Sequence, residues 1–324
     1  MVNRILLLGA GFSRNWGGLL ASEMFDNLLQ QPEISGDQQL RDVLWQHKDG
    51  GGFENALAQV QQDYRNNPAV PDYKRRLDAF QTAIDRIFAD MDRGFATRPS
   101  WEFTNQRERM LVGTLVTFDA IFSLNQDLLF ERFYLNNNVV LESCQRWNGA
   151  VVPGMLEQRD QSFPYDPGKS RWMPLPKADF KVEARFQPYF KLHGSWRWDD
   201  GTGQRLMVMG ASKALTINGH PVLAWYQNEF ERRLRGDTRL MVIGYGFNDA
   251  HINDTILKAA EGGTLRMFIV DPLGVDVANP DRNLPLQRQN PFKDVIGGSS
   301  RRALSEIFGS DPVAHIGISR FLES

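Results

Sequence analysis

The clearest indication of fold class is the segment Arg4-Ile-Leu-Leu-Leu-Gly-Ala-Gly-Phe-Ser13, an apolar run that ends in a Gly-x-Gly turn. No polar residue interrupts it from Ile5 to Leu8, which is typical of a strand buried on both faces of a parallel sheet. Apolar residues then recur at helical spacing from Leu19 to Leu29. The segment therefore predicts a central strand, a tight glycine turn and a following helix.

Further apolar runs with the character of buried strands follow along the chain, and predicted helices separate most of them. The predicted strands are Phe118–Leu124, Pro188–Leu192, Leu240–Ile243 and Leu265–Val270. The predicted helices are Leu128–Tyr134, Leu223–Leu234 and Asp249–Ala260. Strands that alternate with helices predict an α/β fold with a doubly wound, Rossmann-like parallel sheet.

Two long segments interrupt this alternation. Residues 31–117 contain no predicted strand and are helical in pattern over Phe53–Arg93, so we predict a helical insertion. Residues 145–187 are rich in proline, glycine and charge, which predicts a loop excursion over the sheet that covers a site. We expect residues 1–275 to form one domain containing both segments. Residues 276–324 then form a C-terminal extension with one helix and no indicated role.

The composition excludes several classes of protein. The 324 residues are 42% hydrophobic and 23% charged, as in ordinary globular proteins. The formal net charge of −2 provides no basic field for direct nucleic-acid binding. No run of 18 apolar residues exists, so no membrane span is expected. The single cysteine, Cys144, excludes an intramolecular disulfide and a zinc module of paired thiolates, and it favours a cytoplasmic location.

The first glycine turn is a candidate phosphate site. Glycines between a strand and a helix let the backbone approach a phosphate, and Gly9 and Gly11 occupy that position. Arg14 stands where the dinucleotide fingerprint has its third glycine, although its charge suits an anionic ligand. The alternative is a tight turn that binds nothing.

Polar residues at the ends of two later strands are candidates for chemistry. Asn125 and Asp127 follow one predicted strand and would lie at the crevice edge of the sheet, or they could only cap the next helix. His193 follows another strand and is a natural proton acceptor near neutral pH, with Gly194 leaving room for a ligand beside it. The alternative for His193 is a histidine that is merely hydrogen-bonded.

The last two strands end in similar candidates. Gly244-Tyr-Gly-Phe-Asn-Asp249 forms a second glycine-rich turn, which we expect to face the first. Asp271 closes the final predicted strand, where a carboxylate could hydrogen-bond a ribose hydroxyl. The alternative for the second turn is that its polar residues only cap the next helix, and the alternative for Asp271 is a loop aspartate beside Pro272.

Together these motifs resemble the sirtuin-like family of NAD-consuming proteins. The resemblance implies that the first turn holds the NAD pyrophosphate, that Asn125 and Asp127 lie by the nicotinamide and its ribose, and that His193 is the catalytic base. It also implies that the second turn and Asp271 contact the adenosine half. The residues expected to bind NAD are Gly9, Ala10, Gly11, Phe12, Ser13, Arg14, Gly194, Gly244, Tyr245, Gly246 and Asp271.

Two departures from the protein-deacylating members narrow the expectation. Their four-cysteine zinc module is absent, since the chain has one Cys. The Gly-Tyr-Gly-Phe-Asn-Asp form of the second turn resembles bacterial sirtuin-like effectors that destroy NAD during anti-phage defence. The resemblance therefore implies an NAD glycohydrolase that uses NAD as substrate and needs no metal.

Breaking the nicotinamide–ribose bond needs orientation, electrostatic stabilisation and a base, which Asn125, Asp127 and His193 are expected to supply. We expect control by a separate regulatory or sensor protein encoded nearby, by homo- or hetero-oligomerisation, or by both. Two other functions stay open: a regulatory module that binds NAD or ADP-ribose without cleaving it, and, with less support, an NAD-dependent protein deacylase.

Overall fold

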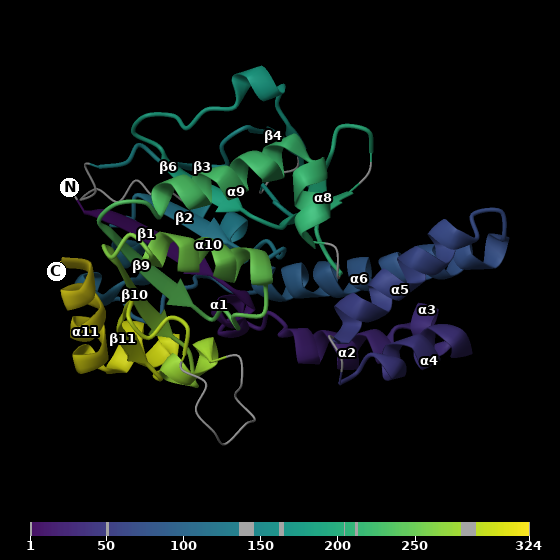
Figure 1. The fold of residues 1–324 in the computed structure, drawn as a ribbon, viewed down its shortest axis with the longest axis horizontal. Coiled ribbons are helices and arrows are strands. Elements are labelled where there is room, and N and C mark those ends of the chain that lie inside the picture. The colour runs from purple at the N-terminus through teal and green to yellow at the C-terminus, as the bar shows by residue number, and fades with distance from the viewer. Residues whose placement is uncertain are drawn as a thin grey trace.

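A seven-stranded parallel sheet forms the centre of the molecule (Figure 1). The computed structural model describes residues 2–49, 52–135, 146–161, 165–203, 205–210, 213–279 and 290–323, so Cys144 lies outside the described residues. The sheet has the order β11-β10-β9-β1-β2-β6-β3. Its strands are β1 (Asn3–Leu8), β2 (Ala120–Ser123), β3 (Ala150–Val151), β6 (Gln187–Lys191), β9 (Thr238–Ile243), β10 (Leu265–Val270) and β11 (Ile296–Ser300). All neighbouring pairs run parallel, which confirms the predicted sheet.

Helices cover both faces of this sheet. Phe122 of β2 is level with Leu7 of β1, whereas Phe268 of β10 is level, across β9, with Leu6. Since successive side chains of a strand point to opposite faces, these two rings lie on opposite faces of the sheet. Phe230 of α9 (Pro221–Arg233) packs on Phe122 with ring centroids 4.9 Å apart. Phe321 of α11 (Pro312–Glu323) packs on Phe268 at 5.3 Å. The sheet is therefore doubly wound, as predicted.

The connectivity reverses direction at β1. From β1 the chain builds β2 and β6 on one side, and it later returns to build β9, β10 and β11 on the other. Residues Ile5–Leu8 are at most 1% exposed because both neighbours and both helical layers cover them. Open sheets of this kind bind ligands at the carboxyl ends of the strands beside such a reversal.

The helical insertion is confirmed and begins ten residues earlier than predicted. Its helices are α2 (Ala21–Gln30), α3 (Pro32–Ser35), α4 (Gln38–Gln46), α5 (Gly52–Asn66) and α6 (Pro71–Ala96). They extend from the sheet as an arm in Figure 1 and enclose a second hydrophobic core of their own. Trp196 links this core to the rest of the protein, because its ring stacks on Phe88.

The segment 145–187 differs from the predicted loop. It supplies β3, β4 (Met155–Gln158) and β5 (Arg171–Pro174), and the last two join β7 (Gly194–Asp199) and β8 (Arg205–Met207) in a second sheet. These strands were missed because each spans only two to four residues between prolines and glycines, too few to show a period of two. Residues 162–164 of the segment lie outside the described part of the chain.

The C-terminal segment is more closely joined to the sheet than the sequence suggested. Strand β11 forms the edge of the central sheet, and α11 packs against it. The sequence Ile296-Gly-Gly-Ser-Ser300 gives no strand signal because it lacks an apolar run. Gly298 fits there because an added Cβ would lie 2.8 Å from the Phe268 ring.

Shorter elements complete the described structure. They are α1 (Ala10–Arg14), α7 (Leu111–Leu115), α8 (Lys213–Gly219), α10 (Ala250–Ala260) and single turns at Arg107–Arg109, Glu131–Leu135, Lys177–Asp179, Gly274–Ala278 and Glu306–Ser310. Among the residues described, no helix combines the length and apolarity needed to cross a membrane.

Candidate functional site

The strand register brings four of the predicted site segments to one edge of the sheet. Leu8 of β1 is level with Ser123 of β2 and Ile243 of β9, and Ser123 is level with Lys191 of β6. The segments that leave this edge are Gly9–Arg14, Asn125–Asp127, His193–Gly194 and Gly244–Asp249. The site therefore lies at the carboxyl ends of the strands, beside the reversal at β1.

The two glycine turns face each other, as predicted, and they touch through their backbones. The amide of Gly11 donates to the carbonyl of Gly244 at 2.9 Å, and the amide of Gly9 donates to Ile243 at 3.0 Å. Gly244 has a φ of +63°, and a Cβ there would lie 2.3 Å from the amide nitrogen of Phe12. These glycines are required for the close approach of two turns, and the amides of Gly9, Gly11 and Gly244 are already used within the protein.

The rest of the first turn divides between surface, core and site. Ala10 is exposed, and Arg14 forms an ion pair with Glu23 at 2.8 Å. The Phe12 ring is 1% exposed and packs among the aromatic rings of the core. Ser13 is buried, and its hydroxyl accepts a hydrogen bond from the side chain of Asn125.

Asn125 is the most suggestive polar group at this edge. Its side-chain nitrogen donates to the Ser13 hydroxyl at 3.0 Å, and its backbone amide donates to the Ser123 hydroxyl at 3.1 Å. The side-chain oxygen, Oδ1, has no hydrogen-bond partner among the described residues, although Asn125 is only 9% exposed. Since a buried acceptor without a partner costs about 1–3 kcal/mol, this oxygen is suited to a ligand.

Asp127 serves the local backbone. Its carboxylate accepts a hydrogen bond from the amide of Leu129 at 3.0 Å, which caps the helical turn after β2. The capping explanation considered above therefore holds for this contact. Its backbone carbonyl accepts a second hydrogen bond, from the ammonium of Lys191 at 2.5 Å.

Lys191 is a buried charge that the sequence analysis did not select. It is 0% exposed, and besides the Asp127 carbonyl its ammonium contacts Glu131 at 2.6 Å and the Ser195 hydroxyl at 2.7 Å. The lysine thus links the segment that carries Asn125 to the segment that carries His193. A single charged residue within the otherwise apolar predicted strand 188–192 was the signal that could have identified it.

His193 is buried and uncharged. It is 3% exposed, and burial lowers the pKa of its imidazole to about 3. Its carbonyl accepts the amide of Val208 at 2.8 Å, and Gly194, with a φ of +71°, is needed because a Cβ would lie 2.0 Å from the carbonyl oxygen of Leu206. The neutral ring has one unprotonated nitrogen, and that nitrogen can accept a proton.

A second histidine faces His193. The Nε2 atoms of His193 and His251 lie 3.1 Å apart, and one ligating atom each from His193, Asp249 and His251 lies within 4.8 Å of the others. Among the described residues this is the group with the composition and spacing to hold a metal ion. His251 was missed, although its place two residues after the second glycine turn could have drawn attention to it.

The second turn is held by its own side chains. The hydroxyl of Tyr245 accepts the amide of Asp249 at 3.2 Å and donates to Asn253 at 3.0 Å, so it joins the turn to the start of α10. Asp249 also accepts from Lys213 at 2.7 Å. Burial alone would raise the pKa of Asp249, but His193, Lys213 and His251 lower it below its ordinary value.

Gly246 continues this turn, and Asp271 lies two strands away from β1, at the end of β10. The Asp271 carboxylate accepts a hydrogen bond from the amide of Leu273 at 2.9 Å, and its backbone amide donates to Ser300 of β11. Asp271 thus shapes the turn after β10.

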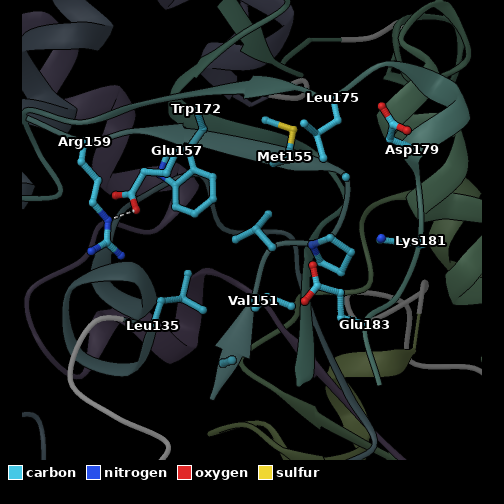
Figure 2. A pocket seen from close by; sticks show the side chains of 14 residues that line it. Leu135, Val151, Met155, Glu157, Arg159, Trp172, Leu175, Asp179, Lys181 and Glu183 are labelled. Carbon is cyan, nitrogen blue, oxygen red and sulfur yellow. Dashed lines mark hydrogen bonds and ion pairs between the residues drawn. The ribbon is translucent and has the colours of Figure 1, made fainter. Parts of the chain in front are cut away.

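A separate pocket lies away from this edge (Figure 2). It has a volume of about 230 Å³, and its wall includes Val151, Glu157, Trp172 and Lys181. Val151 lies level with Pro188 near the start of β6. Pro188 precedes His193 by five residues, so at 3.3 Å per residue the two are roughly 16 Å apart along the strand. None of its lining residues is a predicted site residue.

Comparison with known proteins identifies a domain family for this chain. A SIR2-like domain model matches residues 119–290, more than half of the chain. No curated protein sequence matches. A solved mutant of a Sir2 homologue in complex with 2'-O-acetyl ADP ribose is 13% identical, over 99% of this chain and 94% of that one, with a TM-score of 0.42. By the family match, the chain belongs to the SIR2-like domain family.

Proposed function

We propose that the protein is an NAD glycohydrolase, which converts NAD and water to ADP-ribose and nicotinamide. The observation that carries this proposal is the buried Asn125, whose Oδ1 has no partner among the described residues, at the same strand edge as the neutral His193. An orienting amide and a proton acceptor are what the cleavage requires. Membership of the SIR2-like family adds independent support.

The proposed reaction is a displacement at the ribose carbon that bears nicotinamide. The oxygen of a water molecule bonds to this carbon, the carbon–nitrogen bond breaks with its electron pair going to nicotinamide, and His193 takes a proton from the water. Asn125 Oδ1 orients the water or the ribose, and Ser13 orients Asn125 through their 3.0 Å hydrogen bond. The carboxylate of Asp127 stabilises the positive charge that develops on the ribose.

Binding of the remainder of NAD is assigned by resemblance. The first turn, with Ala10 exposed, would hold the pyrophosphate, and the second turn and Asp271 would hold the adenosine half. The chemistry as proposed uses NAD as its substrate and needs no metal, because nicotinamide leaves as a neutral molecule.

Control of the activity is part of the proposal. An unregulated NAD hydrolase would deplete its host, so we propose activation by a separate protein encoded nearby, by assembly into an oligomer, or by both. The form of the turn Gly244–Asp249 supports a role in anti-phage defence. The single cysteine supports a cytoplasmic location.

One observation favours a second candidate, a module that binds NAD or ADP-ribose without cleaving it. The burial that lowers the pKa of His193 to about 3 makes its imidazole a weak base. A weak base suits a residue that only hydrogen-bonds a ligand.

The test that separates the two functions is nicotinamide release from NAD by the purified protein, alone and with the products of neighbouring genes. A hydrolase releases nicotinamide, and His193→Ala and Asn125→Ala abolish that release. Calorimetric binding of NAD or ADP-ribose with no release under any condition would instead favour the binding module.

A further inference from the structure

Three metal-ligating side chains converge from two separate segments of the chain. His193 leaves the end of β6, whereas Asp249 and His251 begin α10. One ligand atom from each lies within 4.8 Å of the other two, and the two imidazole Nε2 atoms are 3.1 Å apart. The proposed hydrolysis uses His193 alone and leaves the convergence of all three unexplained.

The spacing of the two imidazoles suits a transition-metal ion. Zinc–nitrogen bonds of 2.0–2.1 Å in a tetrahedral site place two nitrogens about 3.3 Å apart. The set of two histidines and one carboxylate leaves a coordination position open for water or another ligand, and imidazole favours zinc, copper, iron or nickel over calcium or magnesium.

The charges around the group also suit a cation. Lys213 is the cation in contact with the cluster, and its ammonium is shared between Asp249 at 2.7 Å and Glu54 of α5 at 2.9 Å. Two carboxylates and one ammonium leave a formal charge of −1 beside the two imidazole rings.

We propose that His193, Asp249 and His251 form a binding site for a divalent transition-metal ion such as Zn²⁺, and that the bound ion inhibits NAD cleavage. Inhibition follows because a metal–nitrogen bond uses the lone pair with which His193 would accept a proton. The inhibitory part rests on the proposed function, whereas the binding part does not.

The binding part is tested by titrating Co²⁺ into the purified full-length protein and recording the visible absorption bands of the bound ion. We expect bands from one ion per chain in the wild type and in His220→Ala, a control that alters a histidine outside the cluster. His251→Ala and the similarly sized His251→Gln should bind at least about 10-fold more weakly, since losing even a partner of a ligand costs 10–100-fold. Circular dichroism would verify that each variant is folded.

Two results would overturn the binding site: no bands in the wild type, or equal affinity in folded His251 variants. The inhibitory part is tested by nicotinamide release with and without saturating Zn²⁺, where we expect at least a 10-fold loss in the wild type and resistance in His251→Ala whatever its own rate. Full activity of zinc-loaded wild type would overturn inhibition. Absence of nicotinamide release without zinc, both from the protein alone and with the products of neighbouring genes, would refute the proposed function and inhibition together. The Co²⁺ bands would still decide whether the site binds metal.

Discussion

Two sets of polar residues at the same sheet edge differ in how completely the protein satisfies them. Lys191 is 0% exposed, and its ammonium contacts three acceptors at 2.5–2.7 Å. Asn125 is 9% exposed and its Oδ1 has no partner among the described residues. The first arrangement stabilises the fold, and the second leaves a hydrogen-bond acceptor for a ligand. Substitutions of Lys191 should therefore change stability, whereas substitutions of Asn125 should change function.

Replacing Lys191 should have the largest effect on stability. Lys191→Met leaves the buried carboxyl group of Glu131 without its cation, and breaking a buried pair in this way costs about 3–5 kcal/mol in the free energy of unfolding. Urea denaturation measures the loss. Lys258→Met is the matched control, because Lys258 is exposed, and its free energy of unfolding should change by no more than about 0.5 kcal/mol. A loss below about 1 kcal/mol in Lys191→Met would contradict the structural role.

Replacing Gly244, where the two glycine turns meet, should have the second-largest effect on stability. In Gly244→Ala the new methyl group would lie 2.3 Å from the Phe12 amide nitrogen at a φ of +63°, so overpacking and backbone strain together should cost about 2–4 kcal/mol. Gly263→Ala is the control, because its φ is +73° but nothing lies within 4 Å of the added atom. Thermal unfolding should rank Gly244→Ala as the less stable of the two, and equal melting temperatures would show that no clash exists.

The hydrogen-bonded carboxylate of Asp37 should contribute less to the free energy of unfolding. Asp37 caps α4 by accepting the amides of Gln39 and Leu40. Burial acts to raise the pKa of its carboxyl group, but the Leu40 amide, Arg75 and Arg76 outweigh burial and lower it. Asp37→Ala should lose about 1 kcal/mol at neutral pH.

The sign of the pH dependence follows from that lowered pKa. The stability that the Asp37 charge contributes is present above the ordinary pKa of 3.8 and is lost as the pH falls through the lower folded value. Urea titrations should therefore show the wild type and Asp37→Asn converging in acid. A difference that grows below pH 3.8 would refute the assignment.

The sequence predicted the parts of the fold whose signal is local. The strand at Ile5–Leu8 and the turn after it were recognisable because a buried parallel strand is continuously apolar. Strand β11 was not, since Gly297 and Gly298 remove that pattern and its place is set by the packing of Phe268 and α11. Short strands and edge strands depend on tertiary contacts that no local pattern contains.

The same division applies to the site. The positions of Asn125 and His193 at strand ends followed from the alternation of strands and helices, which fixes where the carboxyl ends lie. His251 and Lys191 were missed because their importance depends on what lies opposite them in space. The lone lysine in an apolar strand was a local signal, but only the structure shows that Glu131 and Ser195 surround it.

Asn125→Ala should give the smallest change in stability and thereby sharpen the contrast with Lys191. The variant loses the hydrogen bond to Ser13, worth about 1 kcal/mol, but also removes a buried oxygen whose lack of a partner costs a similar amount, so the free energy of unfolding should change by less than about 1 kcal/mol. Nicotinamide release should nevertheless fall by about 100-fold or more, as on loss of one preorganised polar group in an active site. Asn253→Ala is the matched control, because both ends of that amide are bonded, to Tyr245 and to the Phe247 carbonyl, and it should lose more stability than Asn125→Ala. If Asn125→Ala proved the less stable of the two, its amide would belong with the structural set, and the ligand-binding role of Oδ1 would be refuted.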